Sequence, residues 1–291
     1  MRSDSCDIRS LLRYPLTGEA ATHDLQRPAC NLELATGNLQ LLKKMRDDEY
    51  QAMFDLEQNL WWYQGMRKIT RSIIGDNLTT SSELRFLDVG CGTGYSVSWL
   101  KREFKSDAGF GVDISKIAAT FWSKQGLSTA AVSSICELPY VSGAFDLVTC
   151  FDVIYQLDRR GAAAAVNEIA RVLKPGGWLY IREPAYNWLR GSHDEAVGTH
   201  HRYTAGELTR LVGSKGLRAR RVTYANSLLF LPAVAHRLLS KASRSGASDV
   251  RPVAGWINTG LGAILATEAR LLKRSRALFG LSVIVLAQKG V

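Results

Sequence analysis

Short apolar runs alternate with segments of helical spacing in the middle of the chain. The run Phe86–Asp88 leads into the glycine-rich stretch Gly90–Gly94, and the next segment, Tyr95–Arg102, has helical spacing. Gly109–Asp113 is a second apolar run, and it also ends in an acidic residue. A strand, a glycine turn, a helix and a second strand in this order predict part of a doubly wound α/β sheet.

The glycines follow the spacing Gly-x-Gly-x-Gly from Gly90 to Gly94. Glycine lets the backbone turn sharply and approach a ligand, and free N–H groups at a helix start favour negative charge. A dinucleotide turn places its third glycine one residue later, and here Asp88 lies two residues before the first glycine. That carboxylate would repel a pyrophosphate and attract a cation. The pattern therefore favours S-adenosylmethionine, which carries an ammonium, a sulfonium and a carboxylate but no phosphate.

A second acid completes the pattern. In a doubly wound sheet Asp113 lies at the tip of the second strand, and its carboxylate can accept hydrogen bonds from both hydroxyls of a ribose. With these motifs, residues 45–291 resemble the class I S-adenosylmethionine-dependent methyltransferases. The resemblance implies a Rossmann-like, seven-stranded, mostly parallel sheet. It also implies cap helices over residues 45–75 and a helical insertion over residues 225–278, before the last strand.

The later strands of that fold can be assigned along the chain. Gly143–Cys150 is expected to form the fourth strand, and Trp178–Arg182 the fifth, after a helix stop and turn at Lys174–Gly177. Leu217–Tyr224 and Leu281–Ala287 are expected to form the sixth and seventh. Loops at the carboxyl ends of these strands should line the ligand crevice.

The resemblance also implies which residues hold the cofactor. Many relatives use an acid before a Leu-Pro pair to bind adenine, but Ser133–Cys136 occupies that stretch here, so the contact would come from a hydroxyl or a backbone group. Gln156 stands where many relatives have histidine. The predicted cofactor-binding residues are Asp88, Gly90, Cys91, Gly92, Thr93, Gly94, Asp113, Ile114, Ser134, Ile135, Phe151 and Trp62.

An aromatic element precedes the first strand. Asp47–Glu57 has helical spacing with acids at its start, and Glu57 then begins a Glu-x-x-x-Trp-Trp-Tyr pattern that contains Trp61 and Trp62. This pattern resembles an element in a bacterial branch of the family. Either the tryptophans close over the cofactor and exclude water, or they anchor the leading helix to the core. Because successive helical side chains point about 100° apart, each ring can serve one of these roles.

The loops after the fifth strand carry most of the polar residues. The same bacterial branch has a similar His-Asp…Arg-Tyr-Thr element, and the candidate catalytic residues are Glu183, His193, Asp194, His201, Arg202 and Tyr203. A hydroxyl acceptor needs a base, which His193 or His201 could supply if Asp194 orients it. For an alkene acceptor, aromatic faces (Trp61, Trp62, Tyr186) and Glu183 would matter more. The alternative is a hydrogen-bonded clamp that holds the loop, and the pattern Thr204-x-x-Glu207 predicts a capping box.

The insertion before the last strand is partly apolar. Ser227–Leu239 is apolar almost throughout, and Asn258–Arg276 predicts an amphipathic helix with Glu268 on its apolar face. A salt bridge from Glu268 to an arginine is expected, and a role as an active-site acid is the alternative. The insertion is interpreted as a cap over the acceptor site, with docking to a membrane surface as the alternative.

The net charge of +10 is unevenly distributed along the 291 residues. Residues 215–291 contain thirteen Lys or Arg against two acids, 13 − 2 = +11, which leaves −1 for the first 214 residues. Such asymmetry suggests a membrane surface, an anionic substrate or a nucleic acid as partner, or only a solvated basic face. Nucleic acid ranks lowest, because aromatic residues are not interleaved with the basic ones.

The five cysteines show no metal-ligand spacing, so no metal site is predicted, and reduced thiols in the cytoplasm are expected. No apolar stretch reaches the ~18 residues that a membrane span needs. Residues 1–44 are expected to be a poorly ordered extension. The predicted function is methylation of a small-molecule acceptor at oxygen, nitrogen or carbon, in secondary, isoprenoid, lipid or glycan metabolism. A non-catalytic S-adenosylmethionine-binding protein and a nicotinamide-dependent oxidoreductase are the alternatives.

Overall fold

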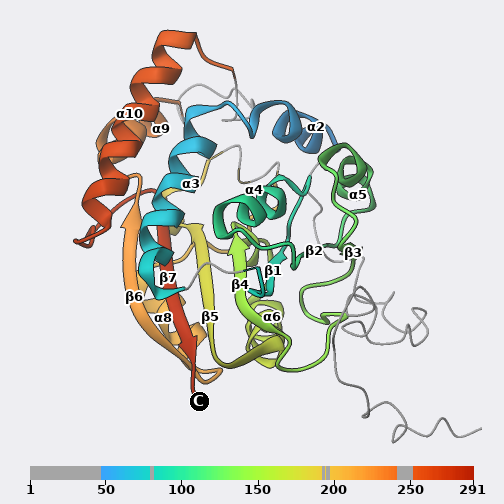
Figure 1. Ribbon diagram of the computed structural model, residues 1–291. Helices are drawn as coiled ribbons and strands as arrows, with labels where there is room; N and C mark the ends of the chain where they lie inside the picture. Colours follow the sequence, from blue (N-terminus) through green and yellow to red (C-terminus); the bar gives the residue numbers. More distant parts are fainter. Residues whose placement is uncertain (1–46, 79–81, 192–193, 195–196, 241–251) are drawn as a thin grey trace, which may run out of the picture.

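The computed structural model describes residues 47–78, 82–191, 194, 197–240 and 252–291. Its centre is a seven-stranded sheet in the order β3-β2-β1-β4-β5-β7-β6 (Figure 1). Only β7 runs antiparallel to its neighbours β5 and β6. The predicted doubly wound, mostly parallel sheet is therefore confirmed. The strands are β1 (Phe86–Val89), β2 (Gly109–Asp113), β3 (Ala130–Val132), β4 (Phe145–Phe151), β5 (Leu173–Pro184), β6 (Leu217–Ala225) and β7 (Ser282–Lys289).

Helices cover both faces of the sheet. In Figure 1, α3 and α4 lie in front of the sheet and α6 and α8 behind it. The helices are α2 (Asp47–Leu56), α3 (Trp61–Ile74), α4 (Tyr95–Phe104), α5 (Lys116–Trp122), α6 (Arg159–Val172), α8 (Ala205–Gly213), α9 (Phe230–Ser240) and α10 (Gly255–Leu272).

The buried strands divide the core into two parts, because successive side chains on a strand point to opposite faces. Leu87, Val148 and Leu179 pack with α6 and α8 on one face. Their neighbours Phe86, Leu147 and Tyr180 pack with α3, α4 and α10 on the other. Both faces are apolar, as expected for a largely parallel sheet.

Helix α10 belongs to the second core rather than standing apart from it. Leu265 and Leu272 are buried there, and a Cβ on Gly65 of α3 would lie 2.3 Å from Leu265 Cδ1, so glycine lets the two helices approach closely. Asn258 joins the helix starts: its Oδ1 accepts from Trp61 N at 2.7 Å, and its Nδ2 donates to Asn59 O at 2.9 Å. The insertion is thereby fixed to the N-terminal helices.

The structure corrects three expectations about element ends and contacts. Strand β5 begins at Leu173, which pairs with Phe145, and a register irregularity follows before Trp178 pairs with Leu147. The predicted turn at 174–177 therefore lies within the strand. Helix α10 begins and ends earlier than the predicted 258–276. Glu268 is buried but accepts from the backbone N–H groups of Ser227 and Leu228, at 3.0 and 3.4 Å, and from no arginine among the described residues.

Two local expectations, the capping box and the sixth strand, are confirmed. The capping box of Thr204 and Glu207 begins α8, with each side chain bonded to the other residue's backbone. The predicted sixth strand matches β6 to within one residue. Residues 1–44 lie outside the described residues. Among the helices that are described, none is long and apolar enough to span a bilayer.

Candidate active site

The glycine turn lies where β1 passes into α4. Gly90, Gly92 and Gly94 all have positive φ, at 75°, 52° and 88°, a region that glycine adopts without strain. The N–H groups of Gly90 and Cys91 both donate to Val112 O, at 2.8 and 2.9 Å, so β2 holds the turn. A Cβ on Gly90 would lie 2.3 Å from Val153 Cγ2. The turn lies beside the β1–β4 boundary, where the strand order reverses and such sheets bind ligands.

Asp113 is held against this turn by backbone donors. Its Oδ2 accepts from Gly92 N and its Oδ1 from Ser115 N, both at 2.8 Å. Each oxygen retains a second lone pair for a ligand hydroxyl. Burial raises the pKa of Asp113, and these backbone hydrogen bonds oppose that rise.

Asp88 lies deeper than Asp113. The carboxylate is 1% exposed, and it accepts from the Thr149 hydroxyl at 2.7 Å and from the Ser96 hydroxyl. Burial raises the pKa of Asp88 to about 6, although both hydroxyls lower it. The two hydroxyls tie Asp88 to α4 and β4, and its contact with a ligand ammonium stays a prediction.

Helix α2 and Glu57, the residue after it, cover the turn. Neither α2 nor Glu57 was among the predicted site residues. Both oxygens of Glu57 lie within 2.7 Å of Thr93 Oγ1, and Glu57 Oε1 also accepts from Gln125 Nε2 at 3.1 Å. Burial raises the pKa of Glu57 to about 7. A Cβ on Gly92 would lie 2.6 Å from Met53 Cε. Glu57 was noticed only as the start of the tryptophan pattern, and a buried position after a short helix has no sequence signal of its own.

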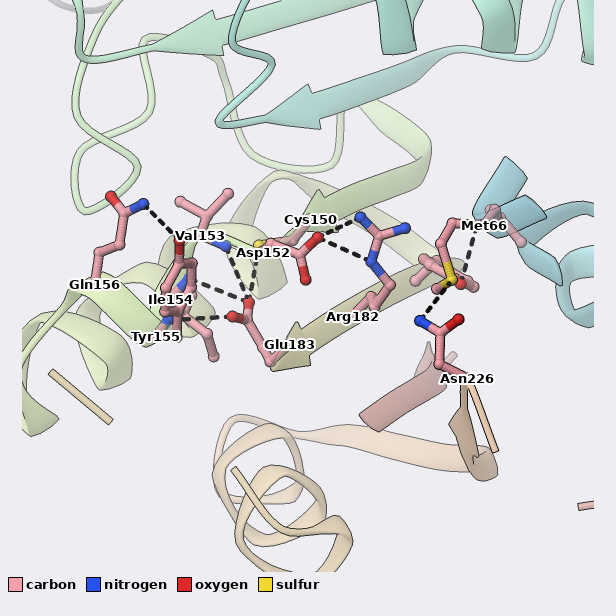
Figure 2. A network of polar contacts seen from close by, with 12 residues as sticks. Met66, Cys150, Asp152, Val153, Ile154, Tyr155, Gln156, Arg182, Glu183 and Asn226 are labelled. Carbon is pink, nitrogen blue, oxygen red and sulfur yellow. Dashed lines mark hydrogen bonds and ion pairs between the residues drawn. The ribbon is translucent and has the colours of Figure 1, made fainter. Parts of the chain in front are cut away.

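A charged pair lies at the carboxyl ends of β4 and β5. Arg182 forms an ion pair with Asp152, and Figure 2 shows the two side chains facing each other across the strand ends. The guanidinium lies 5.1 Å from the Trp62 ring centroid and 5.2 Å from that of Phe151, so it is held between two aromatic rings. Asp152 retains 22% side-chain exposure, and its φ of 55° is unusual for a non-glycine residue. Sequence reasoning missed both charged residues.

Glu183 points in the opposite direction from Arg182 along β5. It is fully buried and accepts from the backbone N–H groups of Val153, Ile154 and Tyr155, at 3.3, 3.1 and 3.1 Å (Figure 2). These donors begin the short helix η5 (Ile154–Gln156). Burial, with a contribution from nearby Asp152, raises the pKa of Glu183 well above its ordinary value. The contacts assign Glu183 to the support of η5, and they show no route for it to an acceptor.

A buried ion pair between Asp194 and Arg202 connects two parts of the polar loop after β5. Arg202 donates from Nε and Nη2 to the two oxygens of Asp194, at 2.7 and 3.0 Å, and both residues are 4% exposed. Burial opposes ionisation, but the hydrogen bonds and charge of Arg202 hold the pKa of Asp194 below its ordinary value. Arg202 Nη1 also donates to Ala185 O at 3.3 Å. These contacts match the clamp alternative.

The expected orientation of a histidine base by Asp194 is wrong for His201. Its Nδ1 lies 3.0 Å from Asn187 Nδ2, and its Nε2 lies 3.4 Å from Glu207 Oε1. Tyr203 is buried, packs edge-on against His201, and pairs with Ala185 as an isolated bridge. His193 lies outside the described residues.

The remaining predicted cofactor residues differ in burial. Ile135 is buried, and Ser134 Oγ accepts from Cys136 N at 3.2 Å. Ile114 is half-buried and follows Asp113 directly. Cys91 is buried against β2. Trp61 lies beside α10, where a Cβ on Gly262 would lie 3.9 Å from Trp61 Cβ, and the Trp62 ring stacks on Arg182; the division of roles between the two rings stays a prediction.

These residues fit S-adenosylmethionine. Three glycines with left-handed φ leave three of the five positions of the turn without a side chain, and Asp113 keeps free acceptor capacity beside it. No described residue in the turn carries a positive side chain that would select a pyrophosphate. Asp113 would hold the ribose hydroxyls, and the Gly90–Gly94 backbone would lie along the amino-acid part.

Comparisons with known proteins agree with this geometry. A sequence model described as a methyltransferase domain matches residues 87–181. The chain is 29% identical over 139 residues to the O-methyltransferase cnsE of Penicillium expansum, across 42% of this chain and 49% of that protein. It is 28% identical over 129 residues to the methyltransferase GfsG of Streptomyces halstedii, across 42% of this chain and 44% of that protein.

The fold extends the likeness beyond the matched segment. Geranyl diphosphate C-methyltransferase from Streptomyces coelicolor A3(2) superposes with a TM-score of 0.53 at 15% identity, covering 92% of this chain and 90% of that one. The chain spans about half the length of the two sequence relatives. Residues 87–181 are thus similar to a methyltransferase domain, and the chain as a whole shares the fold of that C-methyltransferase.

Proposed function

We propose that the chain transfers a methyl group from S-adenosylmethionine to a small-molecule acceptor. The observation that carries this proposal is Asp113, anchored by Gly92 N and Ser115 N beside a turn of three glycines with positive φ. The curated relatives named above are methyltransferases, and one is an O-methyltransferase. When bound, the cofactor supplies an electrophilic methyl group on a sulfonium.

Residues of the chain would align the methyl donor with the acceptor and keep water out. Catalysis of such a displacement depends on alignment and on exclusion of water. Helix α2 packs over the turn through Met53, and the Glu57–Thr93 contact ties the end of that helix to it. Trp62 and Phe151 enclose the Arg182 guanidinium at the neighbouring strand ends. Of these side chains, Met53, Trp62 and Phe151 would supply the apolar surface that excludes water near the ends of β1 and β4.

Asp152 is the acidic residue that we assign to the acceptor. It follows β4, keeps partial exposure, and is held by Arg182 at a fixed position. An acceptor hydroxyl or amine could donate a hydrogen bond to its carboxylate, which would orient the nucleophile. Asp194 is also paired with an arginine, Arg202, but its side chain is only 4% exposed, so it is not available to an acceptor.

Labelled methyl transfer tests the proposal. We expect label from S-adenosylmethionine in the small-molecule fraction of acceptor pools, detected by mass spectrometry, and none in the protein or nucleic-acid fractions. Binding of S-adenosylhomocysteine without any transfer would favour the non-catalytic alternative. Once an acceptor is known, Asp152→Asn should lower turnover by roughly 10- to 100-fold.

Asp146→Asn is the matched control for Asp152. Asp146 lies within β4 and also pairs with a cation, Lys174 at 2.7 Å, but it is at the amino end of the strand, whereas Asp152 follows the carboxyl end. Turnover in this control should stay within about twofold of wild type, the range expected for a surface substitution. Equal losses in both variants would contradict a special role for Asp152.

A cytoplasmic location is part of the proposal. Cys91, Cys136 and Cys150 are free thiols, in keeping with a reducing compartment.

A further inference from the structure

Four arginines line one cleft away from the carboxyl ends of the parallel strands. The cleft has a volume of about 300 Å³ and is lined by Arg220, Arg221, Arg274 and Arg276, together with Asn77, Ser275 and Leu286. These residues come from the short helix η3 (Gly75–Asn77), from β6 and β7, and from the chain that follows α10. In Figure 1 the end of α10 lies beside β6. The lining includes no acidic side chain.

An irregularity in β6 brings two consecutive arginines to this cleft. Ala219 pairs with Ala287 and Arg221 pairs with Leu286, so Arg220 is an extra residue without a partner on β7. In a regular strand, neighbouring side chains point to opposite faces. A bulge re-aims a side chain, and here both Arg220 and Arg221 line the same cleft.

Two of the arginines are fixed by hydrogen bonds. Arg221 donates from Nη1 to Lys273 O at 3.4 Å and from Nη2 to Ser275 O at 2.8 Å, which ties the end of α10 to β6. Arg220 donates to Gln288 Oε1, at 3.2 Å from Nε and 2.9 Å from Nη2. These bonds set the shape of the cleft before any ligand is present.

The guanidinium N–H groups of Arg274 and Arg276 are available to a ligand. In the described part of the chain, neither the Arg274 nor the Arg276 side chain makes a hydrogen bond, and none of the four arginines forms an ion pair. Arg221 Nε is buried and has no hydrogen-bond partner. A buried donor without a partner is costly and calls for a ligand or another explanation.

Without a bound anion, the positive charges of the four arginines therefore lie close together, and no acidic side chain in the lining of the cleft neutralises them. Burial, and then the charge of Arg276, lower the pKa of the Arg221 guanidinium. Cations near a helix C-terminus complement the helix dipole, but Arg221 already satisfies two carbonyls there. The partial negative charge at the C-terminus of α10 can explain why one arginine lies there, but not why four arginines line the same cleft.

We propose that this cleft binds a phosphate-class anion through Arg274 and Arg276, with Arg220 and Arg221 as the fixed floor. The guanidinium fork matches two phosphate oxygens, and several forks around one cleft can hold a phosphate or a diphosphate. The Asn77 amide and the Ser275 hydroxyl line the same cleft as further donors. The site lies apart from the glycine turn and does not depend on methyl transfer.

The phosphate could come from a soluble compound or from a lipid head group. Leu271 and Leu278 flank the arginines in the sequence and are 54% and 87% exposed, as a segment that contacts an anionic bilayer would require. A soluble phosphate would need only the arginines. The test therefore carries one arm for each source.

Isothermal titration of the full chain with inorganic pyrophosphate at constant ionic strength tests the soluble source. Co-sedimentation with phosphatidylcholine vesicles, with and without phosphatidic acid, tests the lipid source. The double variant Arg274→Gln/Arg276→Gln removes two exposed charges, and we expect at least about a tenfold loss of affinity. The matched control, Arg210→Gln/Arg218→Gln, removes two exposed arginines outside the cleft and should change affinity less than twofold.

Saturable binding in either arm, lost in the cleft variant and kept in the control, supports the site and identifies the source. Equal weakening in the cleft variant and the control would mean a diffuse basic surface and overturn the proposal. Absence of binding in both arms would overturn it as well. A thermal melt of each variant, with an unchanged midpoint, shows that a loss of binding is not a loss of fold.

Discussion

The glycine turn and the loop after β5 lie at the same edge of the sheet, but opposite kinds of contact stabilise them. At the turn, the acids Asp88, Asp113 and Glu57 accept from neutral N–H, hydroxyl or amide groups, and burial raises the pKa of each. In the loop, Asp194 meets Arg202, and the pKa of its carboxyl is lowered. The hydrogen-bond partners of the acids at the turn are neutral, so a cationic ligand would meet no positive side chain already bonded to them, whereas Asp194 is already neutralised by Arg202. The difference supports the proposal that the turn binds the cofactor and that the loop has a structural role.

The first prediction tests the supporting role of the loop. Arg202→Ala leaves Asp194 buried without its cation, which should lower the free energy of unfolding by about 3–5 kcal/mol and the thermal midpoint by about 10 °C. His200→Ala, an exposed residue of the same loop, is the control and should change the midpoint little. If Arg202 faces the acceptor, as the sequence analysis also allowed, Arg202→Ala should lose turnover without losing stability. That result would return Arg202 to the acceptor site.

The second prediction uses the pH dependence of the turn. The folded pKa of Glu57, about 7, lies above its ordinary value of 4.5. Its contribution to stability is therefore present below pH ~4.5 and is lost as the pH rises through ~7. Between pH 5 and pH 8, the wild type should lose roughly 2–3 kcal/mol more unfolding free energy than Glu57→Gln.

Urea unfolding at the two pH values measures that difference. Glu137→Gln, at an exposed position, should behave as the wild type does. Parallel pH profiles for the wild type and Glu57→Gln would show that the Glu57 carboxyl is ionised throughout, and would contradict the burial argument.

The third prediction concerns the acid that we assign to the ribose. Asp113→Ala removes hydrogen bonds to a charged group, worth about 1.5–3 kcal/mol, and should weaken S-adenosylhomocysteine about ten- to a hundredfold. Asp107→Ala, an exposed aspartate just before β2, is the control and should bind normally. Calorimetric titration gives both affinities. Equal affinity in the two variants would remove Asp113 from the site.

The smallest effect is expected at the tryptophans. If Trp62 lies over the bound cofactor, Trp62→Phe should reduce the change in indole fluorescence on ligand binding. Trp61→Phe should keep that change, because Trp61 lies where α3 meets α10. A ligand-dependent signal that is the same in both variants would leave both rings with an anchoring role only.

The sequence predicted the turn well because its determinants are local. Three alternating glycines after an apolar run require a tight turn, and β1 and β2 end within one residue of the expected positions. The capping box at Thr204 was found for the same reason, since both partners lie three residues apart. Local patterns of this kind carry their own geometry.

Long-range pairs could not be predicted in this way. The partners of Asp152, Glu57 and Glu268 lie 30, 36 and 41 residues away, and nothing in the spacing selects them among the other polar residues. Asp194 and Arg202 were singled out, but the sequence could not distinguish an ion pair between them from two groups that face an acceptor. Tertiary packing alone makes that choice.

The central claim is that the glycine turn binds S-adenosylmethionine and not a dinucleotide. Calorimetric titration of the full chain with S-adenosylhomocysteine, and separately with NADH, tests it most directly. We predict saturable binding of S-adenosylhomocysteine at one site per chain and no heat from NADH. Saturable binding of NADH, with no heat from S-adenosylhomocysteine, would contradict the account.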